Sequence, residues 1–245
     1  AYPGERPVFT GGKRITKWRM EGDRWVAEIP EVVDQGWNFY TLWVNGEHRR
    51  PARTPNEGFL RTAGKAPKLV DAATGTEVDR GNIAFMYAPG EIQRWANLDD
   101  VIVHVYQSWD VFYGRIADID GNSHVVTFKM KASWPFEHWG SKQRYFLENY
   151  LEALDAPGEW YLDRQKGLLY YLPREGETIE NTEVIAPVVQ HLVRLEGKPE
   201  EAHYIEFVRF AGLSFQHTNF VIPSEGMKDH QAAYEVDAAF QARGA

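Results

Sequence analysis

The sequence contains no cysteine among its 245 residues, which excludes disulfide bonds, a thiolate nucleophile and cysteine metal ligands. It has no apolar run near the roughly 18 residues that a membrane-spanning helix needs. It also lacks a His-Glu-x-x-His run, an acidic calcium loop, a phosphate-binding glycine-rich loop and a Gly-x-Ser-x-Gly elbow. We therefore predict no metal site, no cofactor and no membrane insertion.

Positive charge is also scarce, because 27 Lys and Arg residues stand against 35 Asp and Glu residues, giving a net charge of -8. The basic residues are scattered and form no stripe, which argues against a nucleic acid as partner. The chain begins at Ala1 without a Met and ends at Ala245 directly after an apolar-rich run. We therefore expect a chain that was processed or trimmed.

Apolar and aromatic residues, by contrast, make up 43% and 14% of the chain, enough for a sizeable core in one or two domains. Short strand-like runs separated by turn residues dominate. The clearest strands are predicted at 101–107, 111–118 and 124–129, and Asn45-Gly46 is a strong hairpin signal. The first of these strands is apolar on nearly both faces, which is typical of a strand buried between two layers.

A landmark segment runs from Tyr145 to Pro173. Apolar residues at three- and four-residue spacing predict a short helix over 149–155, which Pro157-Gly158 then ends. Two aromatic-rich runs follow, 159–163 and 168–172, joined by Arg-Gln-Lys-Gly, and they predict a tight hairpin.

This landmark, LENYLEALDAPGEWYLDRQKGLLYYLP, resembles a segment near the start of secreted bacterial right-handed parallel β-helix proteins, and in particular of glycoside hydrolase family 141 and its relatives. Three more stretches fit the same pattern: LWVNGEHRRPARTPNEG at 42–58, YIEFVRFAGLSFQHTNF at 204–220 and EGMKDHQAAYEVDAAFQARGA at 225–245. The resemblance covers this whole chain but only the N-terminal part of a typical family member.

The resemblance implies a mainly β fold, in which the first coils of a right-handed parallel β-helix carry an inserted antiparallel, sandwich-like domain with a short helix. We place initial coil residues at 1–30, the inserted domain at 31–183 and the resumed coils at 184–245. Short apolar bursts at 192–195 and 205–210 are consistent with a solenoid. From the residues alone, this last region is predicted only to be β.

Two aromatic-rich constellations are candidate substrate contacts. The first contains Trp134, Glu137, His138 and Trp139, and the second contains Trp109 beside Gln107, Asp110 and Tyr113. Flat aromatic faces suit the C–H faces of sugar rings, and an indole N–H can reach a hydroxyl. The competing interpretation is structural: a plug over the core for the first and a hairpin tip for the second.

Two further constellations come from stretches that match the family. Arg53 and Asn56 lie on a proline-stiffened loop, where they could bind sugar hydroxyls or pin the inserted domain. The segment 226–237 holds Asp229, His230, Gln231, Glu235 and Asp237, and the resemblance places it along the solenoid cleft. Gln231 is the preferred substrate contact there, with a structural role as the alternative.

Glycoside cleavage uses two facing carboxyl groups. The resemblance implies that this pair lies beyond Ala245, with Glu137, Asp229 and Asp237 as weak catalytic candidates within the chain. We therefore predict the N-terminal part of a secreted or periplasmic glycoside hydrolase with a carbohydrate substrate. A non-catalytic carbohydrate-binding module is the alternative, and a β-helix polysaccharide lyase is a third possibility.

Overall fold

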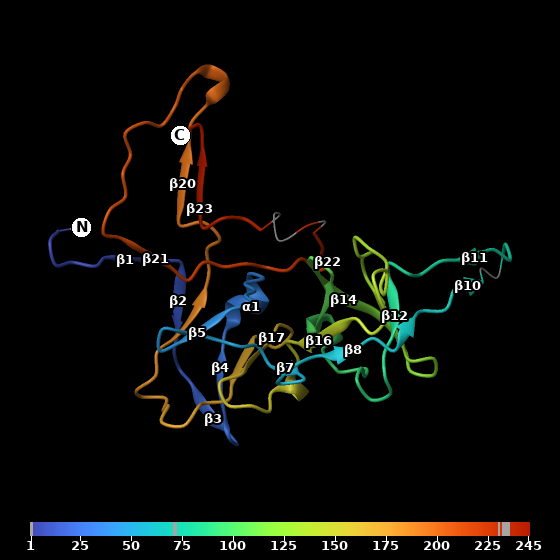
Figure 1. Ribbon diagram of the computed structural model, residues 1–245. Coiled ribbons are helices and arrows are strands. Elements are labelled where there is room, and N and C mark those ends of the chain that lie inside the picture. The colour runs from blue at the N-terminus through green and yellow to red at the C-terminus, as the bar shows by residue number, and fades with distance from the viewer. Residues whose placement is uncertain (1, 71–72, 230, 232–235) are drawn as a thin grey trace.

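The computed structural model describes residues 2–70, 73–229, 231 and 236–245. It is mainly β with one short α-helix in the described residues, which confirms the predicted class (Figure 1). None of the helices in those ranges is long and apolar enough to cross a membrane. The helical segments are α1 (Pro30–Asp34) and the 3-10 turns η1 (Leu98–Asp100), η2 (Leu151–Ala153) and η3 (Pro199–Glu201).

The strands are short and follow one another closely along the chain. In sequence order they are β1 (Val8–Thr10), β2 (Gly12–Ile15), β3 (Arg19–Glu21), β4 (Arg24–Glu28), β5 (Leu42–Val44), β6 (Glu47–Arg49), β7 (Arg53–Thr54), β8 (Leu60–Arg61), β9 (Gly64–Lys65), β10 (Leu69–Val70), β11 (Glu77–Val78), β12 (Ala84–Met86), β13 (Ile102–Gln107), β14 (Asp110–Asp120), β15 (Val125–Phe128), β16 (Arg144–Glu148), β17 (Trp160–Asp163), β18 (Leu168–Tyr171), β19 (Val184–Pro187), β20 (Val193–Glu196), β21 (Ser214–Gln216), β22 (Gly226–Met227) and β23 (Phe240–Arg243).

The largest sheet in the described part of the chain has nine strands, all paired antiparallel. Its path is β7–β16–β13–β14–β15–β12–β9, with β8 paired to β16 and β22 paired to β14. Side chains alternate between the two faces of each strand. On β13, Val103 and Val105 therefore enter the main core, whereas His104 and Tyr106 lie on the opposite face.

Two four-stranded sheets enclose a second core. Their orders are β17–β18–β4–β3 and β2–β19–β5–β6. Large rings fill this core: Trp25 packs against Tyr171 at 5.5 Å, and Phe39 stacks on Trp160 at 5.6 Å. Burial of each ring contributes on the order of 2 kcal/mol. In these sheets, β2 and β4 pair antiparallel with β19 and β18, so residues 12–28 are joined to residues 168–187.

Both hairpins expected from local turn chemistry are confirmed. Asn45 and Gly46 adopt positive φ angles of 52° and 77° between β5 and β6, as a two-residue hairpin turn favours. The second hairpin joins β17 to β18 through residues 164–167. Gly167 ends that loop with φ 65°, and a Cβ there would lie 2.8 Å from the carbonyl oxygen of Ile29.

The helix predicted over 149–155 is wrong in extent, because only the 3-10 turn Leu151–Ala153 forms there. Asn149 has a left-handed φ of 66°, and its side-chain nitrogen donates to the carbonyl of Asp100 at 2.9 Å. Tyr150 is extended and packs its ring on Trp95 at 4.3 Å. These tertiary contacts outweigh the weak helical periodicity. The α-helix of the described chain lies instead at Pro30–Asp34, where Pro occupies the first turn.

Two strand pairs among the described residues are parallel. β1 pairs with β21, which stacks Phe9 on Phe215 at 5.4 Å, and β20 pairs with β23. Figure 1 shows β20 and β23 standing apart from the larger sheets. These pairs are short, so the right-handed β-helix and the three-part division of the chain remain predictions.

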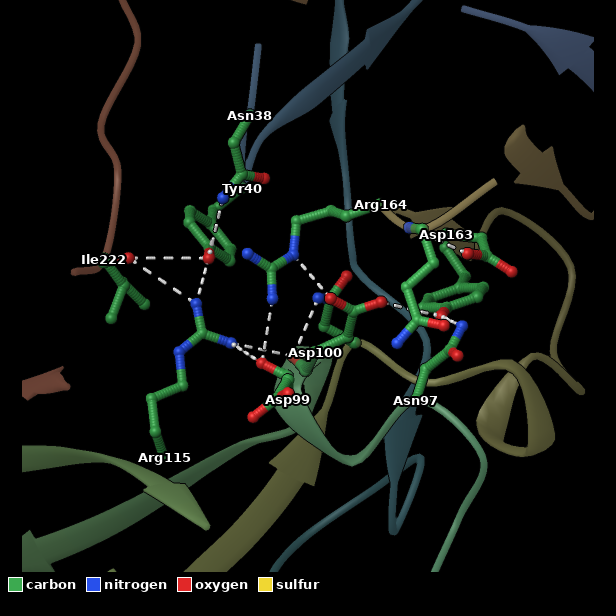
Figure 2. Close-up of polar contacts among 12 residues, drawn as sticks. Asn38, Tyr40, Asn97, Asp99, Asp100, Arg115, Asp163, Arg164 and Ile222 are labelled. Atoms are coloured by element: carbon green, nitrogen blue, oxygen red, sulfur yellow. Dashed lines mark hydrogen bonds and ion pairs between the residues drawn. The ribbon is translucent and has the colours of Figure 1, made fainter. Parts of the chain in front are cut away.

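A buried polar network joins the nine-stranded sheet to its surroundings (Figure 2). Arg115, which is 1% exposed, donates to the carbonyls of Asp99 and Asp100 at 3.1 and 2.9 Å and to the hydroxyl of Tyr40. The Asp100 carboxylate also pairs with Arg164 and accepts a bond of 3.0 Å from Tyr161. The network therefore ties β14, the β17–β18 hairpin and the chain before β5 into one assembly.

Candidate functional site

The two aromatic constellations predicted from separate parts of the sequence lie together at one end of the nine-stranded sheet. Trp109 lies in the two-residue turn between β13 and β14, where Ser108 has a φ of 38°. Trp134, His138 and Trp139 lie on the loop after β15. We call these four residues the tryptophan cluster.

The rings of the tryptophan cluster are in mutual contact. The centroid of Trp139 lies 4.7 Å from that of Trp109, 5.1 Å from that of Trp134 and 4.7 Å from that of His138. The centroids of Trp109 and Trp134 are 5.9 Å apart. Trp109 is 52% exposed and Trp139 is 42% exposed, although both are large apolar side chains. The cluster therefore presents aromatic surface to solvent in a fixed arrangement.

The loop that carries this cluster is fixed by a buried anchor. Phe136 is fully buried against Phe85, Phe112 and Phe128, with ring centroids 5.3 to 5.6 Å apart. Its amide donates to the carbonyl of Gly81 at 2.7 Å. The buried side chain of Gln107 donates to the carbonyl of Trp134 at 2.8 Å. Phe136 thus plugs the core, which leaves Trp139 and His138 at the surface.

The three carboxylates proposed as weak catalytic candidates lie in different settings. Glu137 braces the loop, because its Oε1 accepts from the Thr62 hydroxyl at 2.6 Å and from the Lys142 amide at 3.0 Å. Asp229 is buried, and its carbonyl accepts from the Ser133 hydroxyl at 2.9 Å, next to Trp134. Asp237 is exposed and accepts from Gln241 at 3.4 Å.

The segment containing Asp229 reaches the tryptophan cluster through strand pairing. β22 adds to the edge of β14, with Met227 opposite Tyr113 and Gly226 opposite Gly114. A Cβ on Gly226 would lie 2.5 Å from the carbonyl oxygen of Tyr113, so this close approach requires a glycine. Gln231 is exposed, and His230 and Glu235 lie outside the described residues.

Arg53 lies on β7, which pairs with β16 and places Arg53 opposite Glu148, and Asn56 lies on the loop that follows β7. Asn56 donates to the Asp155 carboxylate at 2.8 Å, and Arg53 donates to the carbonyl of Gly58 at 2.9 Å. Both side chains therefore brace this loop. The guanidinium of Arg53 also lies 3.9 Å from the ring centre of Phe146. None of these described contacts brings Arg53 or Asn56 into the tryptophan cluster.

Sequence reasoning missed a pair on the outer face of the sheet. His104 Nε2 lies 2.6 Å from Glu148 Oε1, and its ring stacks on Phe146 at 4.3 Å. The alternation of β13 could have placed His104 on this outer face, because His104 shares a face with Tyr106 while Val103 and Val105 point inward. The partner strand β16 had not been predicted as a strand.

Exposed indole faces in a fixed arrangement can stack on the C–H faces of sugar rings, and a neighbouring imidazole can hydrogen-bond hydroxyls. Among the described residues, no group of three or more His, Cys, Asp or Glu side chains could hold a metal ion. The exposed rings and the neighbouring imidazole favour binding through ring faces and hydrogen bonds.

Comparisons with known proteins support the glycoside hydrolase part of the resemblance read from the sequence. A family model of the GH141 insertion domain matches residues 22–174. A solved structure described as a glycoside hydrolase is similar to this chain with a TM-score of 0.71 and 27% sequence identity. The similarity covers 91% of this chain but 39% of that one, so the chain spans less than half of its length. No curated protein matches.

Proposed function

Because the chain belongs to the family of GH141 insertion domains, we propose that it is the N-terminal part of a glycoside hydrolase in which the tryptophan cluster binds the carbohydrate substrate. The observation that carries this proposal is the contact between Trp109, Trp134 and Trp139, two of which stay strongly exposed. Exposing such rings to water is unfavourable. A sugar ring that covers them would recover that free energy.

The catalytic carboxyl pair is proposed to lie in a part of the protein that follows residue 245. Glycosidases place their two carboxyl groups about 5 Å apart when they retain and about 6.5–9.5 Å apart when they invert the anomeric configuration. Glu137 is occupied in bracing its loop, and Asp237 is exposed beside β23. The 39% coverage of the similar glycoside hydrolase leaves ample room for later catalytic residues in a protein of that size.

The parallel β-helix is proposed on the same basis. The pairs β1–β21 and β20–β23 have the parallel, in-register stacking that successive coils of a solenoid use. The chain's exposed aromatic side chains include Phe9, Phe210 and Phe240 near these pairs, and they would be buried by another coil. A groove of about 810 Å³ runs beside β20 and β23. A next coil that pairs with β23 would fill this groove.

We propose an extracellular or periplasmic location for the whole enzyme.

The test is glycan binding by this chain and hydrolysis by the longer protein. Trp109→Ala and Trp139→Ala should each weaken binding of an oligosaccharide ligand, found on a glycan panel, by about fivefold to fiftyfold, because each removes one stacked ring. Tyr204→Ala, which changes another strongly exposed aromatic residue, is the matched control. Equal affinities of all three variants would refute the role of the cluster.

A non-catalytic carbohydrate-binding role is the second candidate, since all four residues of the tryptophan cluster lie within this chain. Hydrolysis assays on the longer protein separate the two. Release of reducing sugar ends that is abolished by changing a carboxylate beyond residue 245 supports the hydrolase. Saturable binding without any released sugar supports the binding module.

A further inference from the structure

A second group of aromatic rings lies on the outer face of the nine-stranded sheet. Phe59, Tyr106 and Phe146 come from the chain before β8, from β13 and from β16. The ring centroid of Phe59 lies 5.1 Å from that of Tyr106 and 6.4 Å from that of Phe146. Phe59 is 38% exposed. Tyr106 is partly exposed, whereas Phe146 is 8% exposed and is covered by the ring of His104. The three rings therefore form a floor on which Phe59 and Tyr106 are open to solvent.

Two arginines flank this floor. The guanidinium of Arg53 lies 3.9 Å from the ring centre of Phe146, and that of Arg144 lies 5.2 Å from the ring centres of both Phe59 and Tyr106. We call these five residues the arginine–aromatic cluster. The rings hold the guanidinium groups by cation–π contact, which fixes their positions without neutralising their charge.

Neither guanidinium has a carboxylate partner within 4 Å in the part of the chain that the structure describes. The nearby carboxylate of Glu148 is engaged by His104 at 2.6 Å. The Nε atom of Arg53 is buried and has no hydrogen-bond partner among the described residues. Glu148 and Glu57 act on Arg53 only at longer range. In a chain with a net charge of -8, two arginines held over aromatic rings without an ion pair within 4 Å in the described residues require an explanation.

The chemistry of these groups fits one class of ligand. A guanidinium offers parallel N–H donors that match the two oxygens of a carboxylate, and aromatic faces match the C–H face of a sugar ring. A hexuronate unit of an acidic polysaccharide presents both. We propose that the arginine–aromatic cluster is a binding subsite for such a unit, and this inference rests on the carbohydrate-binding function proposed above.

The two clusters are close enough to share one polysaccharide. Tyr106 and Trp109 are three positions apart, so their Cα atoms are separated by at most about 11 Å. A chain of several sugars can therefore contact the tryptophan cluster with one unit and the arginine–aromatic cluster with another. The tryptophan cluster accepts neutral or acidic rings, and the arginines select the acidic ones.

The test compares the affinity of this protein for polygalacturonate oligosaccharides with its affinity for the same oligosaccharides after reduction of their carboxyl groups. Arg144→Gln and Arg53→Gln should each raise the Kd for the acidic form about tenfold or more, because each loses a charged hydrogen-bonding pair. The Kd for the reduced form should stay unchanged. Arg94→Gln, which removes an exposed charge paired with Asp118, is the control and should change neither value by more than about twofold.

Each result separates this inference from the proposed function. Binding of both forms with equal affinity, or of neither form, overturns the acidic subsite, as does an equal loss in Arg94→Gln. If both forms bind with equal affinity and Trp109→Ala and Trp139→Ala lose that binding, the proposed function still stands. Conversely, loss of acidic binding in the arginine variants with normal binding in the tryptophan variants supports the subsite and refutes the role of the tryptophan cluster. Arg144 is exposed, so its variant tests the inference even if Arg53→Gln fails to fold.

Discussion

Glu159 should make the stability of this protein fall as the pH rises from about 4.5 to about 7. Its side chain lies just before β17 and is 3% exposed. The amide of Ala156 donates to Oε2 at 3.2 Å, whereas Oε1 is buried without a hydrogen-bond partner among the described residues. Burial raises the pKa of this carboxyl from 4.5 to about 7, against the opposing effect of nearby backbone amides.

The sign follows from proton binding. In the unfolded chain the carboxyl releases its proton near pH 4.5, whereas in the folded chain it keeps the proton until about pH 7. Between these values the folded state binds more protons, so the unfolding free energy decreases with rising pH. A shift of this size, at 1.36 kcal/mol per pKa unit, sets a ceiling of about 3 kcal/mol on the loss.

Glu159→Gln removes the ionisable group and keeps the shape of the side chain. The variant should therefore gain stability relative to the wild type between pH 5 and pH 8, by up to about 3 kcal/mol. Urea unfolding at pH 5, 6, 7 and 8 and constant ionic strength measures this difference, with Glu180→Gln, at an exposed position, as the control. A difference between variant and wild type that stays constant over this range would refute the reasoning.

Two further predictions concern the main core. Gly114→Ala should lower the unfolding free energy by about 1–3 kcal/mol, because the new Cβ would lie 2.5 Å from the ring of Phe128 and 2.6 Å from that of Phe112. Urea unfolding measures this loss, and a variant as stable as the wild type would contradict the packing. Phe136→Ala should lower the unfolding free energy by about 3–5 kcal/mol. It should also weaken glycan binding, because Phe136 anchors the loop that carries Trp134 and Trp139. A loss of stability at unchanged affinity, measured by calorimetry below the unfolding transition, would show that the loop holds its shape without this anchor.

Local turn chemistry made parts of this fold predictable. The Asn45-Gly46 and 164–167 turns depend on residues next to each other in sequence, and so does the hairpin tip at Trp109. The helix expected over 149–155 failed because Asn149 and Tyr150 bond and pack with residues far away in the chain. The sequence also identified Trp109 and Trp134 as separate candidates. Their contact depends on the loop path that Phe136 fixes, which has no local signal.

The outer face of the sheet was harder to predict for a related reason. The floor formed by Phe59, Tyr106 and Phe146 comes from three segments whose pairing is set by register across β8, β16 and β13. Register depends on long-range packing. A single sequence therefore shows the alternation of β13 but not which residues lie beside Tyr106.

The antiparallel pairing of β2 with β19 has a consequence for synthesis of the protein. Ile15 faces Val184, so the second core cannot close until about 170 residues have followed β2 out of the ribosome. At roughly 5–20 residues per second this is a wait of about 10–35 s, during which Trp25 and Phe39 lack one wall of their core. Nascent chains of this protein should therefore depend on chaperones that shield aromatic segments until β19 emerges.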